Sequence, residues 1–202
     1  MHRNRLINNL LICLVCLILN ILLAFVARVA HSPFFFDTIF TVSATFIGGL
    51  VPGLIVAVLF NPLMTLVFSA FYGMEIAFFD FLYAVCGMAI VFITWIFSRN
   101  KIKQHNSYLA IFSYLLLIAF LTALASSFVA SILDAVVRPL FMNNLGLSPI
   151  DNFSKAFESL QLGSFFSYFL PRLPVTFVDR LICTFAGYAA YRGLEFIQLK
   201  RQ

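Results

Sequence analysis

The sequence predicts an all-α integral membrane protein, a compact bundle of six transmembrane helices with both termini in the cytoplasm. Of its 202 residues, 62% are hydrophobic and only 10% are charged, whereas soluble domains carry about a quarter charged residues. Apolar runs recur along the whole length and leave no stretch for a soluble domain. We therefore expect residues 1–202 to form a single transmembrane domain.

The spans follow from the thickness of the bilayer. A hydrocarbon core of about 30 Å requires about 20 apolar residues per helix. The first apolar run follows Arg3 and Arg5, as a signal peptide would, but it is too long for one and no convincing cleavage site follows. We expect it to be retained as the first of six spans, at about 6–30, 35–50, 52–72, 76–98, 107–137 and 171–193.

The second span is the shortest and meets the third at GGLVPG (48–53). Gly48 and Gly49 permit a tight turn there, and Pro52 suits the first position of a helix. Small residues then repeat every four positions, which lets neighbouring helices approach closely. These ridges are Gly49, Gly53 and Ala57 in the third span, and Ala119, Ala123, Ser127 and Ser131 in the fifth.

Cys13 and Cys16 form a C-x-x-C pair, which in a soluble chain would indicate redox or metal chemistry. The pair lies within an apolar helix with no histidine nearby, and small residues are common at contacts between membrane helices. We interpret both cysteines as packing residues.

The distribution of Lys and Arg predicts the orientation. With the N-terminus inside, eight basic residues lie on the inner side and four on the outer side, an excess that favours cytoplasmic termini. The inner group comprises Arg3, Arg5, Arg99, Lys101, Lys103, Arg192, Lys200 and Arg201, and the outer group Arg28, Arg138, Lys155 and Arg172. The formal net charge of +5 is dispersed in this way, so we expect no nucleic-acid partner, whereas the lipid bilayer is an obligatory one.

The long connection before the last span contains DNFSKAFESLQL (151–162), a short amphipathic helix by its pattern. Asp151 is a plausible N-cap, and Phe153, Phe157 and Leu160 fall on one face. This outer helix either lies on the bilayer surface or covers an outward-facing cavity, and both interpretations remain open.

Soluble-enzyme motifs are absent. The chain has no P-loop, no G-x-S-x-G, no H-E-x-x-H and no Rossmann glycine pattern. His2, His31 and His105 are far apart in the predicted topology, which argues against a histidine metal site or a catalytic triad. We therefore expect no enzymatic activity, no catalytic residue, no metal and no cofactor.

Charges inside the membrane are costly and usually face the bundle interior or a water-filled cavity. Asp179 and Arg180 lie about five residues into the last span, or roughly 7–8 Å at 1.5 Å per residue. Asp134 and Arg138 share a face at the outer end of the fifth span, because they are four residues apart.

Asp37 opens the second span from outside, and Thr41 and Thr45 follow it on one stripe. Glu75 and Asp80 flank the outer turn between the third and fourth spans. The outer half thus gathers Asp37, Asp134, Arg138, Asp179 and Arg180.

This convergence indicates a binding cavity open to the outside. The alternative is an ion-pair network that only ties helices together, for example Asp134 or Asp179 with Arg138 or Arg180. The inner half of every span is nearly free of ionisable groups. The pattern therefore predicts a cavity that is open to the outside and closed in the inner half. It argues against a channel or a proton relay.

Phenylalanine is abundant, with 26 residues and two clusters at the outer interface, PFFFD (33–37) and SFFSYF (164–169). Most of these rings belong to the lipid-facing belt. A minority could stack on a planar ligand, and the first candidates are Phe36, Tyr168 and Phe169.

Two stretches carry a resemblance to a known family. FFFDTIFTVSATFIGGLVPGLIVAVL (34–59) is a short helix opened by Asp, a Gly-rich inner turn and a helix entered through Pro-Gly. PVTFVDRLICTFAGYAAYRGLE (174–195) is a final helix with an Asp-Arg pair in its outer half and a basic end. Together with size and helix count, they resemble the substrate-binding (S) components of energy-coupling factor (ECF) transporters.

The resemblance implies capture of a vitamin or related micronutrient from outside, at a prokaryotic plasma membrane. It also implies two kinds of partner, a membrane coupling protein and a pair of cytoplasmic ATPases. Carried onto this chain, it makes the five charged residues of the outer half ligand-binding or pocket-shaping, with Phe36, Thr41 and Tyr168 as further candidates.

The first span departs from the family pattern. Many S components show an Ala-x-x-x-Ala ridge there as the docking face for the coupling protein. This chain has Asn20 and Ala24 at that spacing, then Ala27 and Ala30 at a different one. The pattern therefore does not assign the face that docks on the coupling protein, which could be the first helix or another face.

A second hypothesis comes from another class of protein. Related bundles also serve as membrane sensors and cell-shape scaffolds, in which the buried charges would be structural and no small molecule would bind. A proton-coupled carrier is a third option, which the scarcity of ionisable groups in the inner half disfavours.

Overall fold

The computed structural model describes residues 2–30, 32, 34–73, 78–100, 107–141, 154–157, 161 and 163–199. Every regular element in these ranges is helical. The long helices are α1 (His2–Val29), α3 (Leu50–Tyr72), α4 (Ala84–Asn100), α5 (Tyr108–Ile132) and α8 (Ser164–Leu199). The shorter ones are α2 (Ile39–Gly48), the 3₁₀ helix η1 (Phe78–Tyr83), the π-helical η3 (Leu133–Val137) and α6 (Arg138–Phe141).

The chain is a multi-pass helical membrane protein. Four stretches of the described residues are long and apolar enough to cross a bilayer: Ile7–Val29, Leu50–Tyr72, Phe78–Arg99 and Tyr108–Phe141. They agree with four of the six predicted spans. The expected span 35–50 is instead the ten-residue apolar helix α2, which at 1.5 Å per residue is about 15 Å long and too short to cross alone. α8 has the length to cross, but Asp179 and Arg180 lower its hydropathy.

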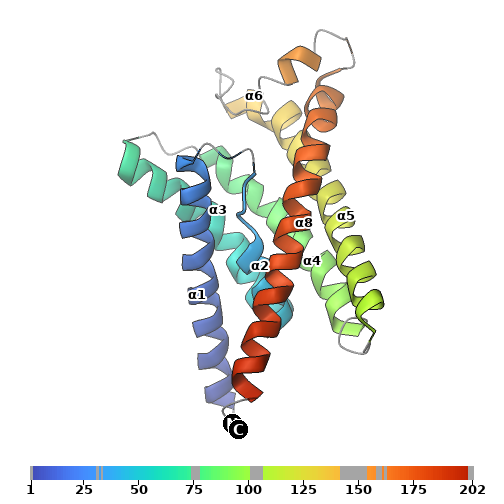
Figure 1. Ribbon diagram of the computed structural model, residues 1–202. Coiled ribbons are helices and arrows are strands. Elements are labelled where there is room, and N and C mark those ends of the chain that lie inside the picture. Colours follow the sequence, from blue (N-terminus) through green and yellow to red (C-terminus); the bar gives the residue numbers. More distant parts are fainter. Residues whose placement is uncertain are drawn as a thin grey trace.

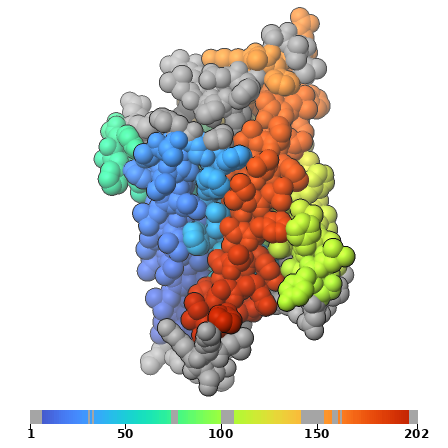
Figure 2. Space-filling model, viewed as in Figure 1, coloured from blue at the N-terminus to red at the C-terminus, as the bar shows by residue number. Residues whose placement is uncertain are grey.

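The short helix α2 lies at the centre of the bundle (Figure 1). It contacts α1, α3, α4 and α8, while α5 packs between α4 and α8. Six consecutive α2 residues, Thr41–Phe46, are buried, as expected for a helix that has neighbours on all sides. The space-filling view shows the chain around α2 between α1 and α8 (Figure 2).

Helix α1 begins and α8 ends at the same end of the bundle (Figure 1). We call this the proximal end, and the opposite end, where α1 ends and α8 begins, the distal end. The start of α1 and the end of α8 lie on one side, as predicted, and which side is cytoplasmic stays a prediction. The proximal half corresponds to the predicted inner half.

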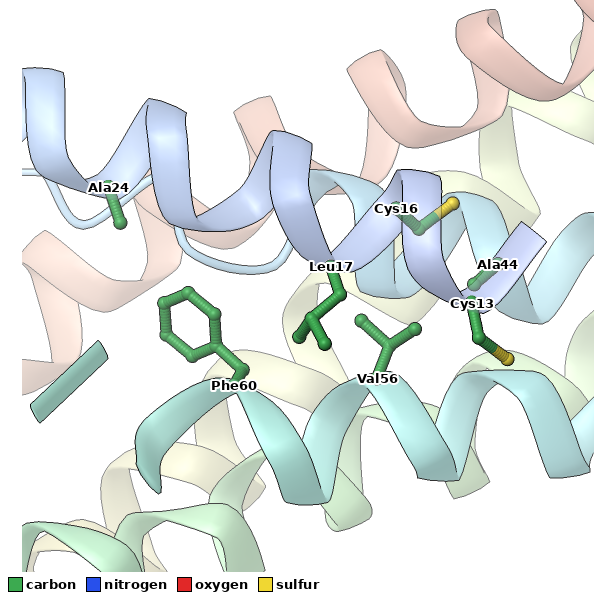
Figure 3. Packing of buried hydrophobic residues seen from close by; sticks show 7 residues of the cluster. All are labelled: Cys13, Cys16, Leu17, Ala24, Ala44, Val56 and Phe60. Atoms are coloured by element: carbon green, nitrogen blue, oxygen red, sulfur yellow. The ribbon is translucent and has the colours of Figure 1, made fainter. Parts of the chain in front are cut away.

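The C-x-x-C pair packs in the interface of α1 with α2 and α3. Cys13 and Cys16 are buried with Leu17 and Ala24 against Ala44, Val56 and Phe60 (Figure 3). The Cys13 thiol lies 3.8 Å from the carbonyl oxygen of Pro52, and all four cysteines are free thiols. The packing interpretation of this pair is confirmed.

An apolar and aromatic cluster occupies the proximal half. Val42 and Phe46 of α2 meet Ile90 of α4 and Leu115 and Ile118 of α5. Two tyrosines of α8 complete it, because the Phe46 ring lies 5.5 Å from the Tyr188 ring and 5.8 Å from the Tyr191 ring. We call these residues the proximal closure.

Several predicted boundaries differ. Gly49 alone links α2 to α3, with φ at 84°, and α3 begins at Leu50, so Pro52 occupies its third position. α8 begins at Ser164, and Pro171 and Pro174, which were expected at the start of the last span, lie inside it. Of the amphipathic segment 151–162, residues 154–157 are helical, whereas Asp151, Phe153 and Leu160 lie outside the described residues.

The small-residue ridges form close helix contacts. The α5 residues Ala119, Ala123, Ser127 and Ser131 are all buried. Gly187 of α8 lies so close to α2 that a Cβ atom there would be 2.8 Å from the carbonyl oxygen of Ile39. Close approach between these helices therefore depends on the absence of a side chain at this glycine.

Candidate functional site

Asp179 binds the chain that connects α1 to α2. Its Oδ1 accepts hydrogen bonds from the backbone N–H groups of Phe35 and Phe36, each at 3.0 Å. The carboxylate is fully buried. Phe36 has a positive φ of 50°, so this carboxylate holds a turn that the backbone rarely adopts by itself.

Arg180 holds the residues immediately after that turn. Its Nη1 lies 3.2 Å from Asp37 Oδ1, donates to Thr38 Oγ1, and lies 3.6 Å from Asp179 Oδ2. We call Asp179, Arg180, Asp37, Thr38 and the bound backbone of Phe35 and Phe36 the loop clamp.

The loop clamp is required because α2 is short. Because α2 begins only at Ile39, the preceding residues enter the distal half of the bundle without helical hydrogen bonds. Irregular backbone inside a membrane protein needs partners from the protein itself. The Asp179 carboxylate supplies them, and Arg180 compensates its charge.

A second group of charges surrounds Asp134. This fully buried carboxylate accepts a hydrogen bond from the Tyr83 hydroxyl of η1. It forms ion pairs with Arg138 Nη1 at 3.5 Å and with Arg172 Nη2 of α8 at 2.5 Å. We call these four residues the Asp134 cluster.

The backbone at Asp134 departs from a regular α-helix. Residues 133–137 form a π turn between α5 and α6, and π turns within helices are frequent at functional sites. The extra residue in the turn changes the direction in which the following side chains leave the helix.

Three buried hydroxyl groups lie between the two charged groups. Ser127 and Ser131 of α5 and Thr176 of α8 have no hydrogen-bond partner among the described residues. α5 and α8 run antiparallel (Figure 1), and the ring contacts of Phe120 with Phe177 at 6.1 Å and of Phe112 with Phe185 at 5.5 Å fix their register. Along these helices the three hydroxyl groups lie on the proximal side of Asp134 or on the distal side of Asp179. We call these three residues the hydroxyl row.

The row differs from the other hydroxyls of the same helix. Thr122 and Ser126 donate to α5 carbonyl oxygens one turn earlier, at 2.7 and 2.6 Å. Arg172 resembles the row, because its Nη1 is buried and has no partner in the described part of the chain. Thr94 of α4 also has an unpaired hydroxyl, but it lies one turn beyond Ile90, next to the proximal closure.

Both charged groups act on one position of α4. The charges of Arg172, Arg180, Asp37 and Asp134 all reach the Cys86 thiol. The loop clamp and the Asp134 cluster therefore both lie near Cys86, in the distal half of the bundle. Below it lies the proximal closure.

The predicted site residues divide accordingly. Asp37, Asp179 and Arg180 meet in the loop clamp, and Asp134 and Arg138 in the Asp134 cluster. Phe36 contributes its backbone N–H to the clamp, and its ring lies 5.8 Å from that of Phe34. Their role in binding a ligand stays a prediction.

Three other candidates lie elsewhere or face neighbours. Thr41 lies between α1 and α2, where its Oγ1 accepts a hydrogen bond from Asn20 Nδ2 at 2.8 Å. It therefore belongs to neither charged group. Tyr168 is buried in the first turns of α8, and the Phe169 ring stacks on Phe165 at 5.5 Å. Glu75 lies outside the described residues.

Sequence reasoning missed several members of the site. Arg172 was counted only as an outer charge, because the two prolines beside it suggested the start of the helix. Tyr83, Thr176 and Thr38 carried no pattern of their own. Asn20 gave a usable signal as a lone amide in an apolar helix, and it is fully buried, with Oδ1 accepting from the Phe40 N–H at 2.9 Å.

In the described residues, no group of three or more His, Cys, Asp or Glu side chains could hold a metal ion. The chain was also compared with known proteins. No family model, no curated protein and no solved structure matches it.

Proposed function

We propose that this protein is the substrate-capture subunit of an ECF-type importer. It binds a small micronutrient, a vitamin or related precursor, in its distal half. A membrane coupling protein and two cytoplasmic ATPases then drive delivery to the other side. In this proposal the distal half faces outward, the membrane is a prokaryotic plasma membrane, and the chain itself catalyses no reaction.

One observation carries the proposal. Four buried polar groups, the hydroxyl row and Arg172 Nη1, have no partner among the described residues, and the three hydroxyls lie between the two charged groups of the distal half. Buried polar groups normally have partners, and exceptions call for an explanation. A bound polar molecule supplies those partners, and the proximal closure keeps it from passing straight through, as a capture subunit requires.

The small residues of α1 bear on the docking of the coupling protein. Asn20, Ala24 and Ala27 are buried inside the bundle, where α1 packs on α2 and α3. They are not accessible to a partner. If the coupling protein docks on this helix, it meets the large apolar side chains of the exposed face, such as Leu14, Leu22 and Val26.

The test is retention of a ligand and of partners. The tagged full chain is purified in mild detergent from membranes of its own cells, and both bound small molecules and bound proteins are identified by mass spectrometry. We expect one small molecule at near-equal stoichiometry, and a coupling protein with two ATPases. Absence of both would refute the proposal.

A specific observation favours a second candidate, a non-transporting sensor or scaffold subunit. In the loop clamp, Asp179 and Arg180 both make structural contacts with the chain before α2. A scaffold needs nothing more from these charges. It would purify with a signalling or cell-envelope protein and without a small molecule.

A further inference from the structure

Two prolines interrupt the backbone hydrogen bonding of α8 near its distal end. Pro171 and Pro174 lie inside the helix, and proline has no backbone N–H. The carbonyl oxygens of Ser167 and Leu170 therefore cannot receive the hydrogen bond that comes from four residues later in a regular helix. Residues 164–170, about two turns of helix, are thus joined to the rest of α8 by a weakened backbone. We call these residues the distal arm.

The distal arm packs on α5 through aromatic side chains. The Phe165 ring lies 5.5 Å from that of Phe128 of α5, and it stacks on Phe169 within the arm, also at 5.5 Å. This contact places the arm level with the stretch of α5 around Phe128. Ser127 and Ser131 belong to that stretch, and their buried hydroxyls have no partner in the described part of the chain.

The part of α8 beyond the prolines is held from several sides. Asp179 accepts two backbone hydrogen bonds from the chain before α2. The Phe177 ring lies 6.1 Å from that of Phe120 in α5, and Gly187 lies directly against α2. The two parts of α8 therefore differ, because the long proximal part is fixed to the bundle and the arm is attached to it only through the weakened backbone.

An ion pair lies at the junction of the two parts. Arg172, between the prolines, places Nη2 2.5 Å from Asp134 Oδ2, and Asp134 itself belongs to the π turn Leu133–Val137. This contact ties α8 to α5 at the position where the helix lacks its own hydrogen bonds. Prolines in membrane helices are tolerated when neighbouring helices supply such compensating contacts.

We propose that the distal arm is a hinged segment, which turns about Pro171 and Pro174 and is held against α5 by the ion pair between Arg172 and Asp134. With the ion pair formed, the arm lies along α5 as in this structure. When the pair separates, the arm turns away and the stretch of α5 around Phe128 becomes accessible. The hinge goes beyond the proposed function and does not depend on it, because a scaffold protein could have the same hinge.

The test measures distances between two spin labels in the full chain by pulsed electron paramagnetic resonance. Spin-labelled non-natural amino acids replace Phe166 in the arm and Val26 on α1, which are both exposed, so the four native cysteines stay in place. Leu117 on α5, also exposed, is a second reference, so that a displacement at right angles to one vector still changes the other distance. Ile182 is the matched control for Phe166, because it is an exposed residue of α8 beyond the prolines.

The size of the expected shift follows from the length of the arm. Phe166 precedes Pro171 by five residues, or roughly 7–8 Å along the helix. A bend of about 20°, the size that is almost always traced to proline or a similar local feature, displaces it by about 2–3 Å. In the wild-type chain we expect one narrow distance distribution for Phe166, because the ion pair holds the arm.

Arg172→Met removes the ion pair and leaves Asp134 with its contacts to Arg138 and Tyr83. It should shift or broaden the Phe166 distances by at least about 2–3 Å and leave those of Ile182 unchanged.

Replacing both prolines by alanine restores the two missing N–H groups. In that background Arg172→Met should leave the Phe166 distances unchanged as well. Thermal unfolding of each variant shows that the bundle is intact. If Arg172→Met does not fold, Arg172→Lys, which loses the planar guanidinium, takes its place in the same comparison.

Four results would overturn the hinge. The Phe166 distances could stay the same without the ion pair, or they could already be broad in the wild-type chain, in which case the ion pair does not hold the arm. They could change together with those of Ile182, which means that the whole bundle loosens. They could also change to the same extent when both prolines are alanine, which means that the motion does not occur at the prolines. None of these results affects ligand retention, so the proposed function stands or falls separately.

Discussion

The loop clamp makes a quantitative prediction about Asp179. Two backbone N–H groups depend on a single carboxylate oxygen, those of Phe35 and Phe36. A hydrogen bond to a charged acceptor contributes about 1.5–3 kcal/mol net, and one to a neutral acceptor about 0.5–1.5 kcal/mol. Because both groups are only partly buried, the lower ends of these ranges apply.

Asp179→Ala removes both bonds and should reduce the free energy of unfolding by about 3 kcal/mol. Asp179→Asn keeps a neutral oxygen for the two N–H groups and should cost about 1–2 kcal/mol. Equilibrium unfolding with SDS in mixed micelles measures both values. Thr176→Val is the control on the same helix, because it replaces an unpaired hydroxyl and should cost nothing or stabilise.

Two results would contradict this account of the clamp. One is a cost below about 1 kcal/mol for Asp179→Ala, which means that water replaces the carboxylate freely. The other is an equal cost for Asn and Ala, which means that the charge matters and the hydrogen bonds do not. In either case the structural explanation of the buried acid fails.

Other contacts lead to further predictions, each measured in the same unfolding assay. Asn20→Ala should cost about 2–3 kcal/mol, because it leaves a backbone N–H and a hydroxyl of α2 without their partner; an effect below 1 kcal/mol would contradict this. Gly187→Ala should destabilise, since its Cβ would lie 2.8 Å from α2, whereas Gly193→Ala, with nothing within 4 Å, should be neutral or stabilising. Tyr83→Phe removes the hydroxyl that donates to Asp134 and should cost about 1–3 kcal/mol; no measurable loss would mean that Arg138 and Arg172 alone satisfy this carboxylate.

The parts of the fold that follow from composition and spacing were predictable. The length of the apolar stretches predicted the long helices. The spacing of four residues predicted that Asp134 lies next to Arg138. The four-residue ridge of α5 predicted a buried face. These properties are local, so the residues within one helix are sufficient to determine them.

The parts that depend on long-range contacts were not predictable. The pattern could not show that α2 would end up central, nor that Phe35 and Phe36 would need an acceptor 144 and 143 residues away. The start of the last helix was misplaced because a proline usually marks a helix boundary. Pro171 and Pro174 are instead tolerated inside α8, so Arg172 between them is part of the bundle interior.

The loop clamp and the hydroxyl row have opposite effects on the stability of the protein. Each charge in the clamp has a structural partner, so a change there should lower stability whether or not a ligand exists. The hydroxyl row has unpaired groups that cost stability in the protein alone. Residues that a fold retains at a cost to its stability are those in which function is expected to lie. Substitutions in the row should therefore stabilise the bundle and abolish binding together, and a scaffold protein with no ligand would show only the first effect.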